Sequence, residues 1–326
     1  MLIKTRILLI CIVKIGQKYN MEYKKIIITG GSGMVGQSLK KIMPNAIYLN
    51  SKDFDLTKQS QVKLMFETLK PDAVIHLAAK VGGMMDNIKK PAEYFFDNIL
   101  MNTLIIDEAY KSGIKRVISI LSTCIYPDIC EKYPMIESDL HKGPPTITNY
   151  EYGYAKRCLA VQTESYNKQY GTNYQYLIPC NLYGEFDKFG DNSHFIAALI
   201  KKIYIAKKNN DDKIVLFGTG KPLRQFMYSD DLANVIKYCI DNNIYDNMNV
   251  ASEENLSIEE MAKIALKVCQ AEDLTIQFDD TYPDGQYRKD VSNKKLLSII
   301  PDFKFTKIED GIKKTYLKAK EFKKIV

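Results

Sequence analysis

Residues that bind metals or form disulfides are scarce in this sequence. Its 326 residues include three histidines and seven cysteines, and no two cysteines are spaced as CxxC. Because zinc sites usually combine such pairs with histidines, the sequence predicts no bound metal. The cysteines also lack the dense, even spacing of a disulfide framework, so we expect reduced thiols and a cytoplasmic location. They stand at positions 11, 124, 130, 158, 180, 239 and 269.

A membrane-spanning run is also missing from the N-terminus. The apolar run LLICIV at 8–13 is too short to span a bilayer, so we expect no membrane association. No small-residue cleavage site follows it, which argues against a signal peptide. Met21 and an apparent strand at 25 come soon afterwards. We therefore expect residues 1–22 to be an appendage outside the fold, with a targeting segment as the alternative.

The chain has a small excess of positive charge, and part of it lies near the N-terminus. The formal net charge is +7, and the first twenty residues hold Lys4, Arg6, Lys14 and Lys18 but no acid. Subtracting those four leaves +3 for the rest of the chain. Nucleic-acid binding requires lysines and arginines clustered on one face, so we expect no nucleic-acid partner.

Short apolar runs alternate with amphipathic stretches through the first half of the chain. This rhythm indicates βαβ units and a parallel sheet covered on both faces. The expected strands are 25–29, 46–49, 73–77, 116–121 and 174–179, and the expected helices are 33–42, 58–69, 91–111 and 152–169.

The second half of the chain has a different character. Long polar loops are expected at 181–192 and 217–228, and Ser257 with Glu260 forms a capping box at the start of a later helix. We therefore expect an α/β fold: a Rossmann-type doubly wound parallel sheet over 23–182, completed by later segments, and a smaller α/β substrate lobe over 183–326. A cleft should lie at the carboxyl ends of the strands.

A glycine-rich segment joins the first strand to the first helix. Gly30, Gly31, Ser32, Gly33, Met34, Val35 and Gly36 fit GxxGxxG. Glycines let the backbone approach a pyrophosphate, and the helix N-terminus offers free N–H groups and a positive dipole end. A plain glycine-rich turn is the alternative, but the strand and helix on either side favour dinucleotide binding.

The end of the second strand bears on the choice of cofactor. An acid there would bind the ribose 2′-hydroxyl of NAD, whereas basic or small polar residues admit the 2′-phosphate of NADP. The strand ends in Leu49-Asn50-Ser51-Lys52, with Asp53 one step later. We predict NADPH, with Lys52 as a cofactor contact and Asp53 as the residue that would reverse the choice.

Tyr152 and Lys156 form a YxxxK pattern on one face of a predicted helix. An ammonium one turn away should lower the pKa of the phenol, so that Tyr152 can exchange a proton near neutral pH. The pattern alone is weak, because the chain holds 22 tyrosines. It gains weight from Ser122 at the end of the fourth strand, which should meet the helix at the nicotinamide and bind the same carbonyl oxygen.

Several longer motifs are more specific and resemble the GDP-L-fucose synthase family of the extended short-chain dehydrogenase/reductase superfamily. The likeness runs from about 25 to 290, and its most discriminating parts are AAKVGG and STCIYP. The motifs are HLAAKVGG at 76–83, STCIYP at 122–127, NLYG at 181–184, NSH at 192–194 and GTGKPLRQF at 218–226.

The resemblance implies a two-part reaction and a second acid/base pair. That family epimerises C3 and C5 of GDP-4-keto-6-deoxy-D-mannose and then reduces C4 with NADPH to give GDP-L-fucose. By resemblance Cys124 is the base and His194 the acid of the epimerisation, beside Ser122, Tyr152 and Lys156 for the reduction. Packing is the alternative for Cys124, and a surface position is the alternative for His194. Cys158, Cys180, Cys239 and Cys269 are expected to be packing residues.

The resemblance also implies ligand contacts and a homodimer. Outside the glycine loop, the expected cofactor contacts are Lys52, Ala78, Ala79, Leu121, Ser122, Tyr152, Lys156, Pro179, Asn181, Leu182 and His194. The expected substrate contacts are Lys202, Phe217, Arg224, Asp284 and Lys289. Lys202 stands where relatives often have Arg, which keeps the charge but loses bidentate geometry. Ser32 stands where some relatives have an Arg for the 2′-phosphate, which weakens the case for NADP.

Two other functions remain as alternatives. One is an NAD-dependent sugar-nucleotide 4-epimerase or 4,6-dehydratase, but those dehydratases place an acid pair where this chain has Cys124-Ile125. The other is a non-catalytic Rossmann binding module, which would be expected to have lost Tyr152 or Lys156.

Overall fold

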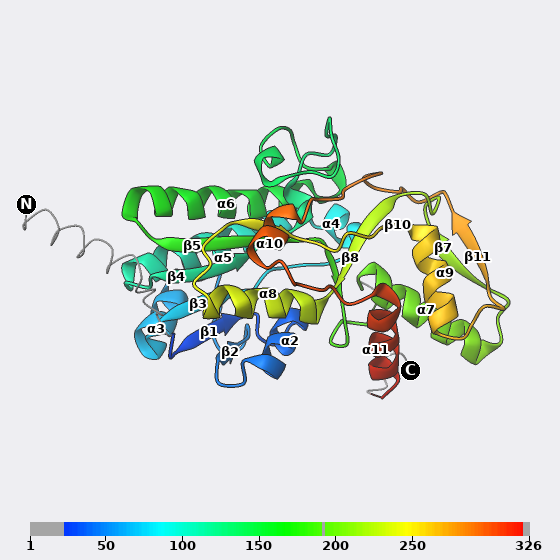
Figure 1. Ribbon diagram of the computed structural model, residues 1–326, viewed down its shortest axis with the longest axis horizontal. Coiled ribbons are helices and arrows are strands. Elements are labelled where there is room, and N and C mark those ends of the chain that lie inside the picture. Colours follow the sequence, from blue (N-terminus) through cyan, green and yellow to red (C-terminus); the bar gives the residue numbers. More distant parts are fainter. Residues whose placement is uncertain (1–22, 191–192, 322–326) are drawn as a thin grey trace, which may run out of the picture.

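A six-stranded parallel sheet forms the centre of the molecule (Figure 1). The computed structural model describes residues 23–190 and 193–321, so the expected appendage at 1–22 lies outside the described residues. The sheet order is β2-β1-β3-β4-β5-β9. Its strands are β1 (Ile26–Thr29), β2 (Ile47–Leu49), β3 (Ala73–His76), β4 (Arg116–Ile120), β5 (Asn173–Pro179) and β9 (Met248–Val250). Because the chain leaves β1 for β2 on one side and returns to β3 on the other, the strand order reverses beside β1, where ligands bind in such sheets.

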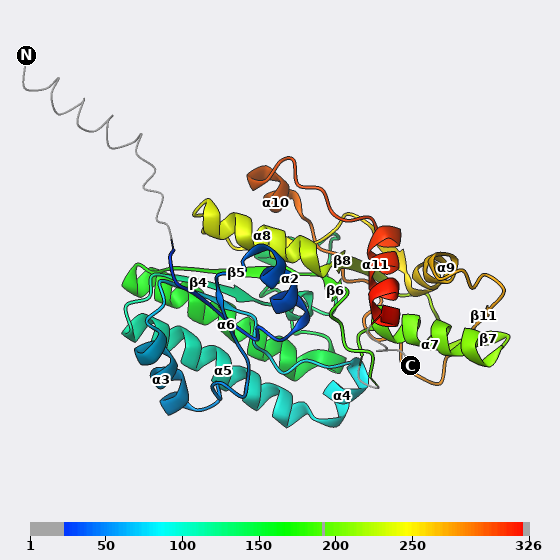
Figure 2. The ribbon, with the colours of Figure 1, turned by 90° about the horizontal axis from the view of Figure 1, so that it is seen from below.

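Helices cover both faces of this sheet, as Figure 2 shows. One face carries α3 (Gln59–Leu69), α5 (Pro91–Lys111) and α6 (Tyr150–Tyr170), and the other carries α2 (Met34–Ile42) and α8 (Ser229–Asp241). With both faces covered, every residue of β3 and β4 is buried. The predicted doubly wound α/β fold is confirmed, and the strands and helices expected in the first half occur within two residues of their predicted ends.

Two segments that the sequence indicated as polar loops contain strands. β6 (Asn181–Tyr183) pairs with β8 (Leu223–Tyr228), and β8 pairs in turn with β10 (Asn255–Ser257). The loop predictions at 181–192 and 217–228 were therefore wrong in these parts. β6 and β10 have three residues each, and their partners lie far away in the chain, so local patterns give little sign of them.

The rest of the second half forms a lobe with a hydrophobic core of its own, which we call the second lobe. It contains α7 (Phe195–Asn209), β7 (Lys213–Phe217), α9 (Ile258–Val268), β11 (Thr275–Asp279) and α11 (Ile308–Glu321). The capping box is confirmed, because Ser257 Oγ accepts from the Glu260 N–H at 3.1 Å and the Glu260 carboxylate accepts from the Ser257 N–H at 2.7 Å. The remaining helices are α4 (Met84–Lys89), α10 (Lys294–Ile299) and the 3-10 turns Thr123–Ile125, Glu137–Asp139 and Ile147–Asn149.

Part of the second half packs against the central parallel sheet and its helices. β9 extends the parallel sheet beside β5, while α8 packs on α2 and α10 packs on β9. Within residues 23–190 and 193–321, no helix combines the length and apolarity needed to cross a membrane, and no group of three metal-binding side chains occurs.

Candidate active site

A cavity of about 1470 Å³ lies at the carboxyl ends of the parallel strands, with the second lobe forming its other wall. Thr29 at the end of β1, Ser122 after β4 and Pro179 at the end of β5 line it on one side. Leu216 of β7 in the second lobe and Arg224 of β8 line the other side. Small-ligand pockets usually measure roughly 300–1,000 Å³, so this cavity has room for more than one ligand.

The glycine loop brings bare backbone to the cavity at the start of α2. Gly30 has a φ of +69°, and a Cβ there would lie 2.8 Å from the Ala78 nitrogen. At Gly36 a Cβ would lie 2.5 Å from the carbonyl oxygen of Gly31. The N-terminus of α2 faces this space with Gly33 as its N-cap and no side-chain cap, an arrangement that suits a bound phosphate. Gly31 itself does not line the cavity, because its Cα packs against Tyr48 of β2.

The Asp53 carboxylate, in the turn after β2, forms its hydrogen bonds within that turn. The Asp53 carboxylate accepts from the backbone N–H of Asn50 at 2.8 Å and from the Asn50 side-chain amide at 2.6 Å. Asn50 and Ser51 line the cavity, whereas Asp53 and the expected cofactor contact Lys52 do not. Lys52 is part of the same turn, where its N–H donates to Asn50 Oδ1 at 2.9 Å. Residues 54–57 also line the cavity, and the sequence reasoning missed them.

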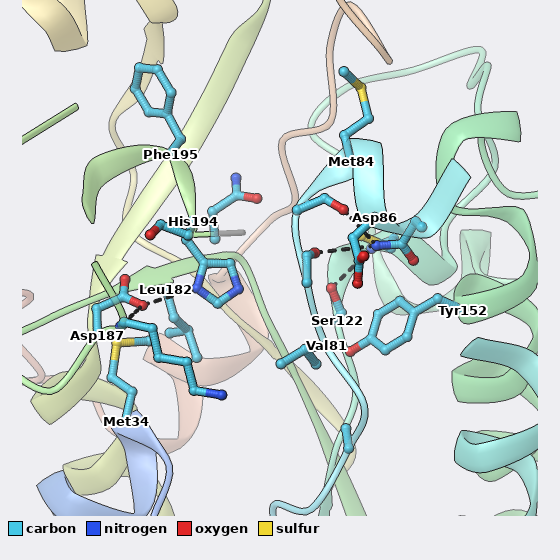
Figure 3. A pocket seen from close by; sticks show the side chains of 18 of the residues that line it. Met34, Val81, Met84, Asp86, Ser122, Tyr152, Leu182, Asp187, His194 and Phe195 are labelled. Carbon is cyan, nitrogen blue, oxygen red and sulfur yellow. Dashed lines mark hydrogen bonds and ion pairs between the residues drawn. The ribbon is translucent and has the colours of Figure 1, made fainter. Parts of the chain in front are cut away.

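Ser122, Tyr152 and Lys156 lie together at the end of β4. Figure 3 shows Tyr152 reaching toward Ser122, whose Oγ accepts from the N–H of Cys124 at 3.3 Å. Lys156 is 2% exposed, and its ammonium donates to the carbonyl oxygen of Ile120 at 2.8 Å. Burial lowers the pKa of Lys156 to about 8.

The pKa of Tyr152 moves in the direction opposite to the one expected from the sequence. Burial raises the pKa of this phenol far above its ordinary value, and Cys124 and Tyr94 raise it further. Lys156 is not among the groups that shift the pKa of Tyr152. The protein therefore holds Tyr152 as a neutral phenol, the form that can donate a proton.

A buried series of hydrogen bonds connects α6 to the central sheet, and the sequence did not predict it. Thr29 Oγ1 lies 2.8 Å from His76 Nδ1, and His76 Nε2 lies 3.1 Å from Asn102 Oδ1. The Asn102 amide then donates to the carbonyl oxygen of Ala155 at 3.4 Å. Burial, with a smaller effect from Lys156, lowers the pKa of His76 to about 3, so this imidazole stays neutral. These hydrogen bonds connect the helix that carries Tyr152 and Lys156 to β1, β3 and α5.

His194 faces these residues from the opposite wall of the cavity (Figure 3). It is the N-cap of α7, and its Nδ1 lies 3.2 Å from the carboxylate of Asp187, which is 4% exposed. The bond to Asp187 raises the pKa of His194, although burial and Lys188 act the other way. Cys124 lies on the Ser122 side, where its thiol is 3.8 Å from the Lys289 ammonium. Two polar pairs therefore face one another across the cavity.

The four cysteines that were expected to be packing residues fall into two groups. Cys180, Cys239 and Cys269 are buried, as expected of packing residues. Cys158 is exposed, so the packing role expected for it was wrong. It lies in α6 but faces solvent rather than the sheet, because neighbouring residues of that helix form the buried face.

All five expected substrate contacts line the cavity. The Lys202 ammonium lies 4.7 Å from the ring centroid of Phe217, and Phe217 stacks on Tyr282 at 3.9 Å. The Arg224 guanidinium donates to the carbonyl oxygen of Leu223 at 2.8 Å.

The Asp284 carboxylate has a structural task in this region. It accepts from the N–H and from Oγ1 of Thr219, each at 2.7 Å. These bonds hold the turn that contains Gly218 and Gly220, both of which have a positive φ.

We expect Asp187→Asn to move the titration midpoint of His194 to lower pH. The carboxylate favours the imidazolium form, so its removal lets the proton leave at a lower pH. Proton NMR can follow this change directly, because the chain has only three histidines and His76, with a pKa of about 3, should stay flat near neutral pH. Asp302→Asn, at an exposed position, is the matched control. An unchanged His194 midpoint in Asp187→Asn would contradict this role for Asp187.

Comparisons with known proteins agree with this arrangement. Residues 26–251 match the NAD dependent epimerase/dehydratase family. The GDP-L-fucose synthase of Dictyostelium discoideum is 38% identical over 305 residues, which cover 90% of this chain and 94% of that protein. A probable GDP-L-fucose synthase of Drosophila melanogaster is 37% identical, with 89% and 95% covered.

A solved structure shows the same fold at a similar level of identity. The crystal structure of a GDP-L-fucose synthetase from Naegleria fowleri bound to NADP is 35% identical, with a TM-score of 0.83, and covers 91% of this chain and 93% of that one. The chain therefore belongs to the NAD dependent epimerase/dehydratase family and, within it, to the GDP-L-fucose synthases.

Proposed function

We propose that this chain converts GDP-4-keto-6-deoxy-D-mannose to GDP-L-fucose by epimerising C3 and C5 and then reducing C4 with NADPH. The observation that carries the proposal is one cavity with two sets of proton-transfer groups. Tyr152, Lys156 and Ser122 form one set, and Cys124 and His194 form a second set. His194 lies on the wall opposite Ser122 and Tyr152 (Figure 3). A plain 4-ketone reduction needs the first set alone.

The second set suits epimerisation because its members approach from different sides. The protons on C3 and C5 are acidified by the neighbouring C4 ketone. The Cys124 thiolate removes one of them, and the electron pair moves to the C4 oxygen as an enolate. His194, as an imidazolium, returns a proton to the opposite face of the same carbon. The bond between His194 and Asp187 favours the form that this step requires.

The first set suits the reduction. NADPH supplies the hydride when it is bound, and the close backbone around Gly30 and Gly36 provides space for its pyrophosphate. Tyr152 then donates its proton to the C4 oxygen, to which Ser122 also donates a hydrogen bond. The buried Lys156 ammonium lies one turn along α6, where it can hold the nicotinamide ribose.

The remaining ligand contacts follow the shape of the cavity. The N-terminus of α2, Asn50, Ser51 and the residues from Ala78 to Ala79 would hold NADPH. The second lobe would hold GDP, with Phe217 against the base and Arg224 toward the diphosphate. Lys202 beside Phe217 retains a positive charge there.

We also propose a homodimer and a cytoplasmic location. The two longest helices, α5 and α6, lie side by side, and both leave apolar side chains exposed. Phe96 on α5 is 58% exposed and Val161 on α6 is 48% exposed. Pairing of these helices with those of a second copy would cover both side chains. The six cysteines in the described part of the chain are free thiols, which suits a reducing compartment.

Incubation of the protein with GDP-4-keto-6-deoxy-D-mannose tests the proposal directly. We expect GDP-L-fucose as the product, with one NADPH oxidised for each molecule formed. NADH should be used less efficiently, since the Asp53 carboxylate is bound to Asn50 and does not line the cavity. Product identification by NMR and initial rates with both cofactors provide the measurement. Turnover without net oxidation of NADPH would instead favour a 4-epimerase, and a preference for NADH would refute the cofactor assignment.

Replacement of Tyr152 by Phe should remove the reduction but leave cofactor binding nearly unchanged. The substitution deletes only the proton donor, and such groups usually contribute about a hundred- to ten-thousandfold to the rate. NADPH binding by fluorescence titration and single-turnover reduction would be measured together. Tyr150→Phe is the matched control on the same helix. A Tyr152→Phe variant that keeps most of its turnover would remove Tyr152 from the mechanism.

Replacement of Cys124 by Ser should separate the two activities. Deuterium exchange from solvent into C3 and C5 should fall by at least about a hundredfold, because the base is lost. Residual NADPH oxidation should give a product with unepimerised centres, since Tyr152 and Lys156 remain. Mass spectrometry and NMR of the product distinguish these results. Exchange at the wild-type rate would return Cys124 to a packing role, and an equal loss of both activities would show damage to folding or substrate binding.

A further inference from the structure

Lys289, which is one of the expected substrate contacts, also lies beside the active-site thiol. Its ammonium is 3.8 Å from the Cys124 sulfur, although the two residues are 165 positions apart in the chain. Lys289 belongs to the segment after β11, whereas Cys124 follows β4 of the central sheet. This contact therefore depends on how the segment after β11 is attached to the central sheet.

Several hydrogen bonds attach that segment firmly. The Gln286 amide donates to the carbonyl oxygens of Pro127 and Asp128, at 3.1 and 2.8 Å, and Gln286 is 8% exposed. The N–H of Met135 donates to the Asp290 carbonyl oxygen at 2.9 Å. These bonds lie on both sides of Lys289 in sequence, and two of their acceptors come directly after the STCIY stretch that contains Cys124. The backbone on both sides of Lys289 is therefore fixed relative to the segment that carries Cys124.

In the part of the chain that the structure describes, the Lys289 ammonium has no acidic partner. Among residues 23–190 and 193–321, no salt bridge joins it to a carboxylate. Burial lowers the pKa of Lys289, and the thiol of Cys124 acts in the opposite direction. Arg224, Tyr152 and Cys180 also lie around this pair; Arg224 is a second cation, and the other two are neutral in their ordinary forms. A thiolate at Cys124 would be the one negative partner that this ammonium gains.

We infer that Lys289 is a positioning residue that holds Cys124 in its thiolate form through a direct ion pair. The thiolate, rather than the thiol, is the basic form of cysteine, and a neighbouring ammonium stabilises it. The catalytic consequence rests on the proposed function, because only the epimerisation uses Cys124 as a base. The ion pair itself is a property of the protein without substrate, so it can be tested separately. A purely substrate-binding role for Lys289 is the competing explanation.

Alkylation of the native protein by iodoacetamide measures the thiolate fraction without substrate or cofactor. The rate is followed for each cysteine by peptide mapping between about pH 5 and pH 10. Cys158, which is exposed, serves as the internal reference within each sample. We expect Lys289→Met to move the midpoint of Cys124 alkylation to higher pH by about one unit, so that its rate near pH 7 falls roughly tenfold. The plateau at high pH reports access to the sulfur and is analysed separately from the midpoint.

Two further variants make the test specific. Lys289→Arg keeps the positive charge, so its midpoint should stay close to that of the wild type, and it remains informative if Lys289→Met folds poorly. Lys304→Met removes an exposed lysine far along the chain and should leave the profile unchanged. A Lys289→Met midpoint equal to the wild type would overturn the inference. An equal shift in Lys289→Arg and Lys289→Met would overturn it as well, because charge would then not be the cause.

The same variants separate this inference from the proposed function. With GDP-4-keto-6-deoxy-D-mannose, deuterium exchange at C3 and C5 in Lys289→Met should recover as the pH rises, following its alkylation midpoint. A substrate-binding role alone would raise KM at every pH without moving the profile, and that result would count against the inference. If the protein did not act on this substrate, the proposed function would fail while the alkylation result stood by itself.

Discussion

The active site depends on a buried set of hydrogen bonds that ties one helix to the ends of the parallel strands. Thr29, His76 and Asn102 connect β1, β3 and α5 to the carbonyl oxygen of Ala155, and Lys156 bonds the same helix to Ile120 of β4. Each of these polar groups is almost inaccessible to water, so loss of one partner would leave another unpaired at a high cost in free energy. This constraint fixes the position of α6, and α6 fixes Tyr152 relative to Ser122.

The cavity has two walls of different origin. One wall is continuous with the central sheet, and the other belongs to the second lobe, which has its own hydrophobic core. Charged or polar partners on each wall have opposite effects: Asp187 favours a protonated His194, and the Lys289 ammonium favours an ionised Cys124. An acid and a base on different walls suit a reaction that removes a proton from one face of a ring and returns it to the other. Tyr152, kept neutral by burial, is suited to a separate proton donation.

Local patterns were sufficient where structure depends on neighbours in sequence. Alternating apolar and amphipathic stretches predicted the first five strands and their helices, because a parallel sheet covered on both faces requires that alternation. The glycine loop could be predicted for the same reason, since its strand and helix are adjacent in the sequence. β6, β8 and β10 escaped prediction because their pairing joins segments such as Asn181 and Phe226 that are far apart in the chain. The direction of the pKa shift of Tyr152 was also missed, because burial exceeds the influence of a lysine four residues away.

The sequence by itself determined the fold class, the phosphate loop, the YxxxK pair and, through its longer motifs, the family. Those features are encoded in residue types at short, regular spacings. Only the tertiary structure decided how the charged groups are used. Asp53 is bound to Asn50 rather than facing the cavity, Asp187 is bound to His194, and Lys289 lies against Cys124. The interaction between two charged groups weakens over a few ångströms, whatever their separation in the sequence. The contact between Lys289 and Cys124, which are 165 positions apart, therefore forms only in the folded protein.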